Sequence, residues 1–201
     1  MGELLVVVTP GTPVAVGQIM RYHEKPSSFS WSYMPLSYPT TTTANFLYTL
    51  GSYMGIDYQN YSSAATHQDA IDTFDHYGYT SDFDLYNQST VMSNIMAGKP
   101  VYVAGSTNAN GAGHAWVCEG YSYSESYEEY QLMVISQIEP PLHYESITSN
   151  YVTGYGQSTY LYHNLGYEGD GDGWYIGHTF NTSEGTFTAL GMIYDITPPT
   201  T

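Results

Sequence analysis

Positive charge is almost absent from this chain. Its 201 residues include three basic side chains, Arg21, Lys25 and Lys99, against 19 Asp and Glu, and the formal net charge is −16. Proteins that hold a phosphate backbone neutralise it with Lys and Arg, so nucleic acid and anionic membrane surfaces are poor partners. Trypsin-like proteases would find almost no cleavage sites. We therefore expect a secreted or cell-surface protein, because such proteases are abundant outside the cell.

Cysteine and long apolar runs are also scarce. Cys118 is the single cysteine, which rules out an internal disulfide. No run of about 18 apolar residues is present, so we expect no membrane span. The seven histidines show no tight ligand spacing, and without a cysteine cluster neither a zinc site nor another cofactor is expected. The oligomeric state leaves no signal in the sequence.

What is present is a chain of uncharged polarity, with 23 Tyr and a hydrophobic share of 42%. Its length suits one domain, residues 1–201. Helical patterns come first and strand patterns second, which predicts an α+β fold with a helical half over about 1–98 and a sheet half over about 99–201. Helices are expected within Thr9 to Pro26 and over 43–54, 64–77 and 89–97; strands are expected over 1–8, 100–104, 114–121, 131–138, 159–164, 174–178 and 186–194.

The stretch from Thr9 to Pro26 predicts a sharp turn followed by a buried helix. Pro10 and Gly11 break the backbone, Thr12 can cap, and the residues from Val14 onward are apolar almost all round. A helix N-terminus that opens from such a turn suits a nucleophile or an anion, because its first N–H groups and its dipole point there. The alternative is a plain core helix.

His114 is the strongest candidate for a catalytic base. It follows a Gly-rich loop, residues 105–113, at the start of a predicted strand. A base of this kind needs a thiol or hydroxyl within about 3 Å. Cys118 lies four residues along the same strand, roughly 13 Å away, and is out of reach. A Thr hydroxyl at Thr9 or Thr12 is a weaker candidate, and the alternative for His114 is a packed residue at a strand end.

Three motifs occur in the order found in one peptidase family: GTPVAVGQIMRYHEKP at 11–26, GAGHAWVCEGY at 111–121 and HNLGYEGDGDGWYIG at 163–177. Together they resemble the streptopain family of bacterial papain-like cysteine peptidases. The resemblance implies a two-lobed papain-like hydrolase fold, a peptide or protein substrate or ligand, and His114 as base and then acid with Asn164 as its support. It further implies that Gly113, Leu165, Tyr167 and Gly169 lie in the substrate cleft.

Departures from the family pattern fall on the reacting groups. The nucleophile position carries Gly11 where the family has Cys, Pro10 replaces a Gly, and Leu5 falls where papain-like enzymes place the oxyanion-stabilising Gln. Leu165 replaces a Trp. The resemblance therefore implies a peptidase domain that is inactive as it stands, a pseudoenzyme. A peptide-binding, inhibitory or surface interaction module that uses a Tyr-lined cleft is the alternative, and residues 122–158 are an insertion.

An acidic turn, EGDGDG, offers a different kind of site. Glu168, Asp170 and Asp172 alternate as the first ligands of an EF-hand calcium loop do, but the twelfth position is Thr179, where that loop requires Glu. A solvated acidic turn is therefore favoured over a calcium site.

Overall fold

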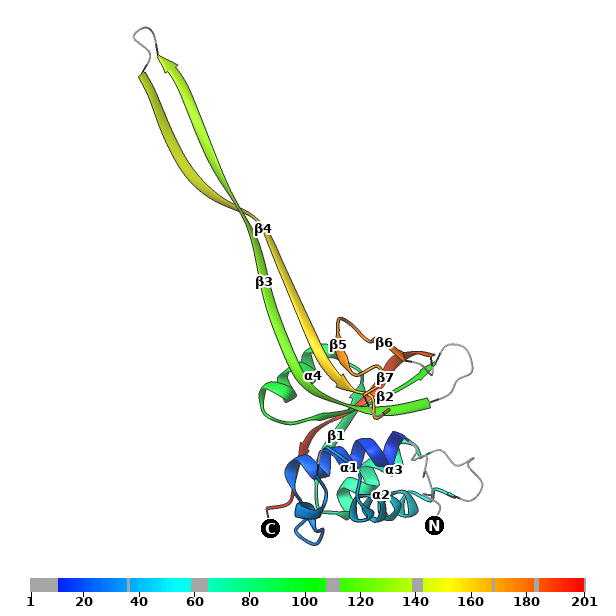
Figure 1. Ribbon diagram of the computed structural model, residues 1–201. Coiled ribbons are helices and arrows are strands. Elements are labelled where there is room, and N and C mark those ends of the chain that lie inside the picture. The colour runs from blue at the N-terminus through cyan, green and yellow to red at the C-terminus, as the bar shows by residue number, and fades with distance from the viewer. Residues whose placement is uncertain are drawn as a thin grey trace. The chain divides into compact units, whose positions relative to one another are not determined.

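The computed structural model describes residues 11–35, 37–58, 65–107, 113–138, 143–167, 169–182 and 185–200. Within them four α-helices accompany a seven-stranded antiparallel sheet, which confirms the α+β class (Figure 1). The elements in chain order are α1 (Gly11–His23), the short 3₁₀ helix η1 (Trp31–Tyr33), α2 (Thr41–Tyr53), α3 (His67–His76), β1 (Thr80–Leu85), α4 (Gln88–Met96), β2 (Val101–Thr107), β3 (Gly113–Ile138), β4 (His143–Asn164), β5 (Gly173–Tyr175), β6 (Thr179–Thr182) and β7 (Gly185–Thr197). The strand expected over 1–8, which includes Leu5, lies outside the described residues, and so do Thr9 and Pro10.

The sheet has the strand order β1-β7-β2-β3-β4-β5, and β6 also pairs with β7. The C-terminal strand β7 lies between β1 and β2 and has antiparallel registers with both. Strand β1 was not predicted, and it comes from the part of the chain that was expected to be helical. Its residues are mostly exposed, so it lacks the alternation of buried and exposed side chains that reveals a strand.

Strand β3 differs most from the prediction. Segments 114–121 and 131–138 were expected as separate strands, but they belong to one strand of 26 residues. The excursion from 139 to 157, which has no clear pattern in the sequence, falls largely in β4. No Pro interrupts the chain between residues 121 and 131, and strand-favouring Tyr is frequent there. Residues 122–159 form a compact unit of their own, the far part of the β3–β4 hairpin.

The main unit has two apolar cores, one on each face of the sheet. Successive residues of a strand face opposite sides. Ala115 and Val117 of β3 pack in the core that contains α1, α2 and α3, whereas Trp116 and Cys118 pack in the core that contains Val91 of α4. Figure 1 shows α1, α2 and α3 gathered on one side of the sheet. The strand period therefore decides that Cys118 is buried on the α4 side.

Helix α1 is buried, as its apolar sequence predicted. Ala15, Val16, Ile19 and Met20 are all fully buried. Gly17 lets α2 approach closely, because a Cβ there would lie 2.7 Å from Cδ2 of Leu47. The helix already begins at Gly11, and the Thr12 hydroxyl donates to the carbonyl of Ala65 at 3.1 Å. The Thr12 side chain therefore links α1 to the segment before α3. It does not cap α1 as predicted.

The other helices begin at polar caps. Thr40 caps α2, Thr66 with Asp69 forms a capping box on α3, and Asn87 caps α4. Ser89 and Thr90 lie inside the first turn of α4 and therefore do not cap it. An N-cap must directly precede the helix so that its side chain can accept from the N–H three residues on, and Asn87 meets this condition with Thr90 at 3.0 Å.

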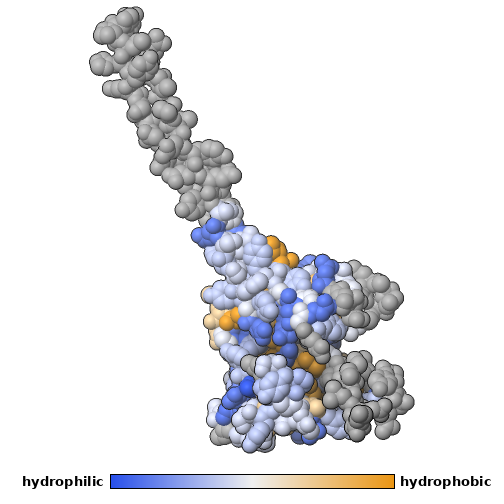
Figure 2. Space-filling model, in the orientation of Figure 1, coloured by the Kyte–Doolittle hydropathy of each residue, from blue (hydrophilic) through white to orange (hydrophobic). Residues whose placement is uncertain are grey.

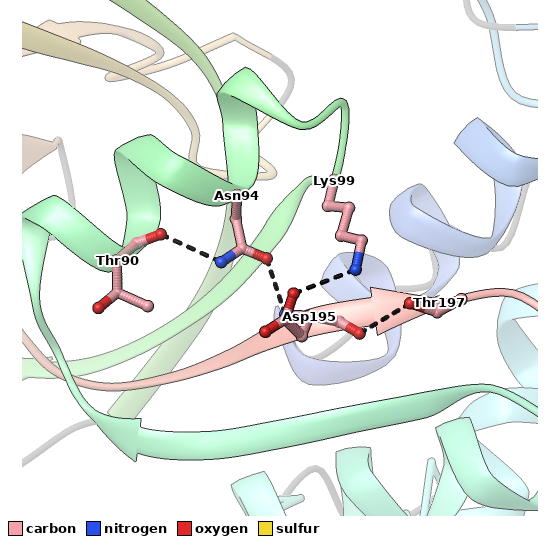
Figure 3. Close-up of polar contacts among 5 residues, drawn as sticks. All are labelled: Thr90, Asn94, Lys99, Asp195 and Thr197. Atoms are coloured by element: carbon pink, nitrogen blue, oxygen red, sulfur yellow. Dashed lines mark hydrogen bonds and ion pairs between the residues drawn. The ribbon is translucent and has the colours of Figure 1, made fainter.

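Helix α4 is joined to β7 by buried Asn94 (Figure 3). Its amide nitrogen donates to the carbonyl of Thr90 at 3.1 Å, and its amide oxygen accepts from the backbone N–H of Asp195 at 2.8 Å. Asp195 has a positive φ of 50° and its carboxylate accepts from Lys99 at 3.0 Å. These contacts hold an unusual backbone conformation at the place where the β1–β7 register shifts.

The surface is polar without being densely charged. On the face drawn in Figure 2, pale hydrophilic colours prevail and strongly hydrophobic areas are small. None of the described helices is long and apolar enough to cross a membrane.

Candidate functional site

Helix α1 and strand β3 meet at Gly11 and His114. A Cβ placed on Gly11 would lie 2.5 Å from Nδ1 and 2.6 Å from Cε1 of His114, and 2.8 Å from the carbonyl oxygen of Ala115. Real Cβ atoms do not approach so closely, so the imidazole already fills the space that a side chain at position 11 needs. The two residues that the sequence analysis paired are thus in direct contact, although they are 103 positions apart in the sequence.

The second ring nitrogen of His114 is held by a backbone carbonyl. Nε2 of His114 lies 2.6 Å from the carbonyl oxygen of Leu165. A carbonyl oxygen only accepts hydrogen bonds, so Nε2 carries the proton in the neutral imidazole and Nδ1 carries the lone pair. The lone pair therefore belongs to the nitrogen beside Gly11, which is the nitrogen that a general base at this site would use.

Two side chains hold the turn that presents Leu165. Oδ1 of Asp172 accepts from the N–H of Leu165 at 2.6 Å, and Oδ1 of Asn164 accepts from the N–H of Gly166 at 3.1 Å. Gly166 has a positive φ of 75°, a conformation that favours glycine. Asp172 was predicted to belong to a solvated acidic turn, but its carboxylate bonds the backbone behind His114. Glu168, the first residue of that turn, lies outside the described residues.

Asn164 lies next to this turn, but its amide bonds other groups than His114. Its Oδ1 also accepts from Nε2 of Gln18 at 3.1 Å, and its side chain hydrogen-bonds Glu119. The polar support of the imidazole that the structure describes is the Leu165 carbonyl. The role of orienting His114, which the resemblance implied for Asn164, stays a prediction.

Aromatic rings enclose the imidazole. The Tyr167 ring is nearly parallel to His114, with centroids 4.4 Å apart, and the Trp116 ring is also nearly parallel at 5.9 Å. Phe187 contacts it at an angle. Trp116 is itself fixed, because its Nε1 donates to Nδ1 of the fully buried His163 at 2.9 Å. Stacked rings and a directed hydrogen bond leave His114 little rotational freedom.

Burial sets the protonation of these histidines. Desolvation lowers the pKa of His114, and the hydrogen bond to Leu165 partly opposes that shift. Desolvation lowers the pKa of His163 to about 3. His163 is therefore neutral at physiological pH and accepts from Trp116 through the unprotonated Nδ1.

A cleft of about 440 Å³ opens beside Gly11 and His114. Its walls are mainly apolar, and three of their large hydrophobic side chains are exposed to solvent, Phe83 (41%), Leu85 (74%) and Leu190 (54%). The His67 ring stacks on Phe83 with centroids 4.5 Å apart. Apolar walls around one or two polar groups are typical of binding sites.

The four residues expected to line the substrate cleft occupy different places. Gly113 lines it at the first position of β3. Leu165 is fully buried and acts through its carbonyl, and Tyr167 stacks on the imidazole. Gly169 is not among the described lining residues and has an open turn conformation with a φ of 96°.

Cys118 and Thr12 do not offer a replacement nucleophile. Cys118 is fully buried, and desolvation raises the pKa of its thiol to about 12. It pairs with Val101 in the β2–β3 register, whereas His114 pairs with Gly105, four positions along. The Thr12 hydroxyl is engaged with the Ala65 carbonyl.

Comparison with known families identifies the scaffold. A model of the peptidase C10 family matches residues 27–175, which is 149 of the 201 residues. The chain belongs to the peptidase C10 family. This is the streptopain family, whose members have a cysteine peptidase fold. A search of curated proteins found no match.

The family match covers only some of the predicted site residues of this peptidase C10 domain. His114 and Asn164 lie inside the matched range, whereas Gly11 and the rest of α1 precede it. The position of Gly11 in the site therefore rests on its contact with His114.

In this peptidase C10 domain, the residues that support the position of His114 were not predicted from the sequence. Trp116, His163 and Asp172 make the supporting contacts, and Phe83 and Leu85 of β1 supply a cleft wall. Alternation along β3 could have placed Trp116 on the same strand face as His114. Nothing local in the sequence indicates that β1 lies beside them.

Proposed function

We propose that this peptidase C10 domain binds extended peptide segments in the His114 cleft and does not hydrolyse them. The observation that carries the proposal is the Gly11–His114 contact. The residue facing the lone pair of the base has no side chain, and the imidazole occupies the volume where one would begin. Covalent catalysis needs a nucleophile within hydrogen-bond reach of its base. Cys118, the single thiol of the chain, is buried in the core on the α4 side.

Binding is supported by the cleft itself. Its apolar walls suit a large apolar side chain of a peptide, and burying such a side chain contributes about 1.5–3 kcal/mol. The scarcity of Lys and Arg supports a location outside the cell, where a domain of this kind would meet secreted or surface-exposed protein segments.

Binding can be tested with a library of fluorescent peptides. We expect micromolar to millimolar affinity for peptides that carry a large apolar residue and weaker binding when Glu replaces Leu85 in the cleft wall. The matched control is Met96→Glu on α4, because Met96 is also exposed (61%) but does not line the cleft. Equal binding by both variants, or no binding by any peptide, would refute the proposed role of the cleft.

Hydrolysis is tested on the same peptides. The unmodified chain should leave them intact. Cleavage that disappears with a thiol reagent or in His114→Ala would show an active peptidase and overturn the proposal. Gly11→Cys provides the comparison for the parent chemistry, with the new thiol as nucleophile and His114 as base. Thiol-dependent cleavage by that variant alone would fit a scaffold that has lost its nucleophile.

A further inference from the structure

A second cavity, of about 570 Å³, lies along helix α1. Its described lining comes from α1, α2, the segment after η1, and strands β3 and β4, and it shares no lining residue with the His114 cleft. Its lining includes the polar residues Gln18, Glu119 and Asn164 and several apolar residues, among them Val14, Phe46 and Leu47.

The hydrogen bonds in this cavity fix how the Gln18 amide is oriented. The backbone N–H of Gly166 can only donate, so the Asn164 atom that it meets at 3.1 Å is the amide oxygen. Nε2 of Gln18 donates to that same oxygen at 3.1 Å. Oε1 of Gln18 consequently points away from Asn164. It is buried and has no hydrogen-bond partner. A buried acceptor without a donor is costly, so a donor from outside the chain, a ligand or a water, would stabilise it.

Glu119 adds a carboxylate to the same cavity. Its carboxylate lines the same cavity and is hydrogen-bonded by Asn164, yet neither ion pair among the described residues involves it. Arg21, the cation that lines the cavity, is engaged elsewhere, with Nε on the Met34 carbonyl at 2.7 Å and Nη1 on Glu24 at 2.7 Å. Among the described residues, the cavity therefore combines a carboxylate that no ion pair engages with a buried neutral acceptor that has no donor.

We propose that this cavity binds a primary alkylammonium group, with the ammonium at Glu119 and Oε1 of Gln18 and the aliphatic stem against Phe46 and Leu47. An ammonium has three N–H donors and no acceptor, which complements this set of groups. The net charge of −16 attracts cations to the surface. Tyr22, whose ring is 60% exposed, also lines the cavity.

The chemistry is tested with n-butylammonium chloride, titrated into the full chain while the side-chain amide resonances of Gln18 and Asn164 are followed by NMR. We expect saturable shifts of both. The neutral alcohol 1-pentanol has a similar size and no charge, and it should bind more weakly by about tenfold, the effect of losing a charge-assisted hydrogen bond. Equal or tighter binding of 1-pentanol, or no saturable shift with the amine, would overturn the proposal.

Substitutions test the residues. Glu119→Gln keeps the shape and removes the charge, and should weaken n-butylammonium binding about tenfold. Asp75→Asn on α3 is the matched control, because it removes one negative charge, as Glu119→Gln does, at an exposed position outside the cavity. Equal weakening in both variants would refute a local site, and urea denaturation of each variant verifies folding. N-acetyl-lysine N-methylamide distinguishes the sources: binding at least as tight as n-butylammonium assigns the site to lysine side chains of a protein, and weaker binding assigns it to small amines.

Discussion

Nε1 of Trp116 donates a hydrogen bond of 2.9 Å to Nδ1 of His163, and both residues are fully buried. The Trp116 ring in turn lies nearly parallel to His114. His163 thus fixes an indole that packs on the imidazole beside Gly11. No charge is needed for this support, because burial keeps His163 neutral.

Removing the acceptor on His163 should destabilise the fold. In His163→Leu the indole N–H loses its partner inside the core, and we expect the free energy of unfolding to fall by about 1–3 kcal/mol. His163→Gln retains an acceptor and should lose less. Urea denaturation of the three proteins measures the difference. If the Leu variant were as stable as the unmodified chain, the hydrogen bond would contribute nothing.

Stability should fall on mild acidification. Burial lowers the pKa of His23, His114 and His163, so each folded-state pKa lies below the unfolded value near 6.5. Their contribution is complete above pH 6.5 and is lost as the pH falls toward the folded values, about 3 for His163. Below its unfolded pKa each group changes the free energy of unfolding by up to about 1.4 kcal/mol per pH unit. Urea denaturation at pH 7, 6 and 5 tests this, and His163→Gln should flatten the slope by one group's share.

The Gly11–His114 contact predicts that alanine at position 11 destabilises the fold more than alanine at an uncrowded glycine. Gly11→Ala forces His114 and the Ala115 carbonyl to move, and we expect a loss of about 1–3 kcal/mol. Gly173→Ala is the matched control, because a Cβ there meets no atom closer than 3.9 Å. Urea midpoints compare the two. The packing around Gly11 would be looser than described if both variants unfolded at the same urea concentration.

Thiol labelling tests which residue faces the base. In the native chain iodoacetamide should leave Cys118 unmodified, since the thiol is buried and its pKa is raised to about 12. In Gly11→Cys the new Cβ displaces the imidazole as it does in Gly11→Ala, but the shifted ring still lies next to the thiol. We therefore expect rapid labelling at neutral pH, because a thiol beside an imidazole is activated as a thiolate. Mass spectrometry reports the site and rate. The contact is contradicted if His114→Ala in the Gly11→Cys background leaves the rate unchanged.

Trypsin should cut this chain at one bond. Lys25 and Lys99 are each followed by proline, before which trypsin does not cleave, and Arg21 lies within α1 with its guanidinium bonded to Met34 and Glu24. We expect the native chain to survive and the urea-unfolded chain to yield fragments 1–21 and 22–201. Rapid degradation of the native chain would remove the support that protease resistance lends to a location outside the cell.

Much of the fold can be predicted from local sequence patterns. The buried α1, the helices at 41–53, 67–76 and 88–96, and strand β2 follow from apolar periodicity and from Gly and Pro at element ends, because such signals act over a few residues. Strand β1 was missed and β3 was divided in two, since mostly exposed residues carry no alternation and the length of an insertion hairpin depends on its partner strand.

By itself the sequence determined the family motifs and the near absence of positive charge, and it predicted a site at His114 and Gly11, because these features depend on residue identity. Tertiary structure alone decided what touches His114. The Leu165 carbonyl, the Phe187 ring and the β1 wall of the cleft come from distant parts of the chain, and their meeting with His114 depends on packing and register. The same holds for Gly11. The sequence shows a missing side chain there, and only the fold shows that the imidazole fills its place.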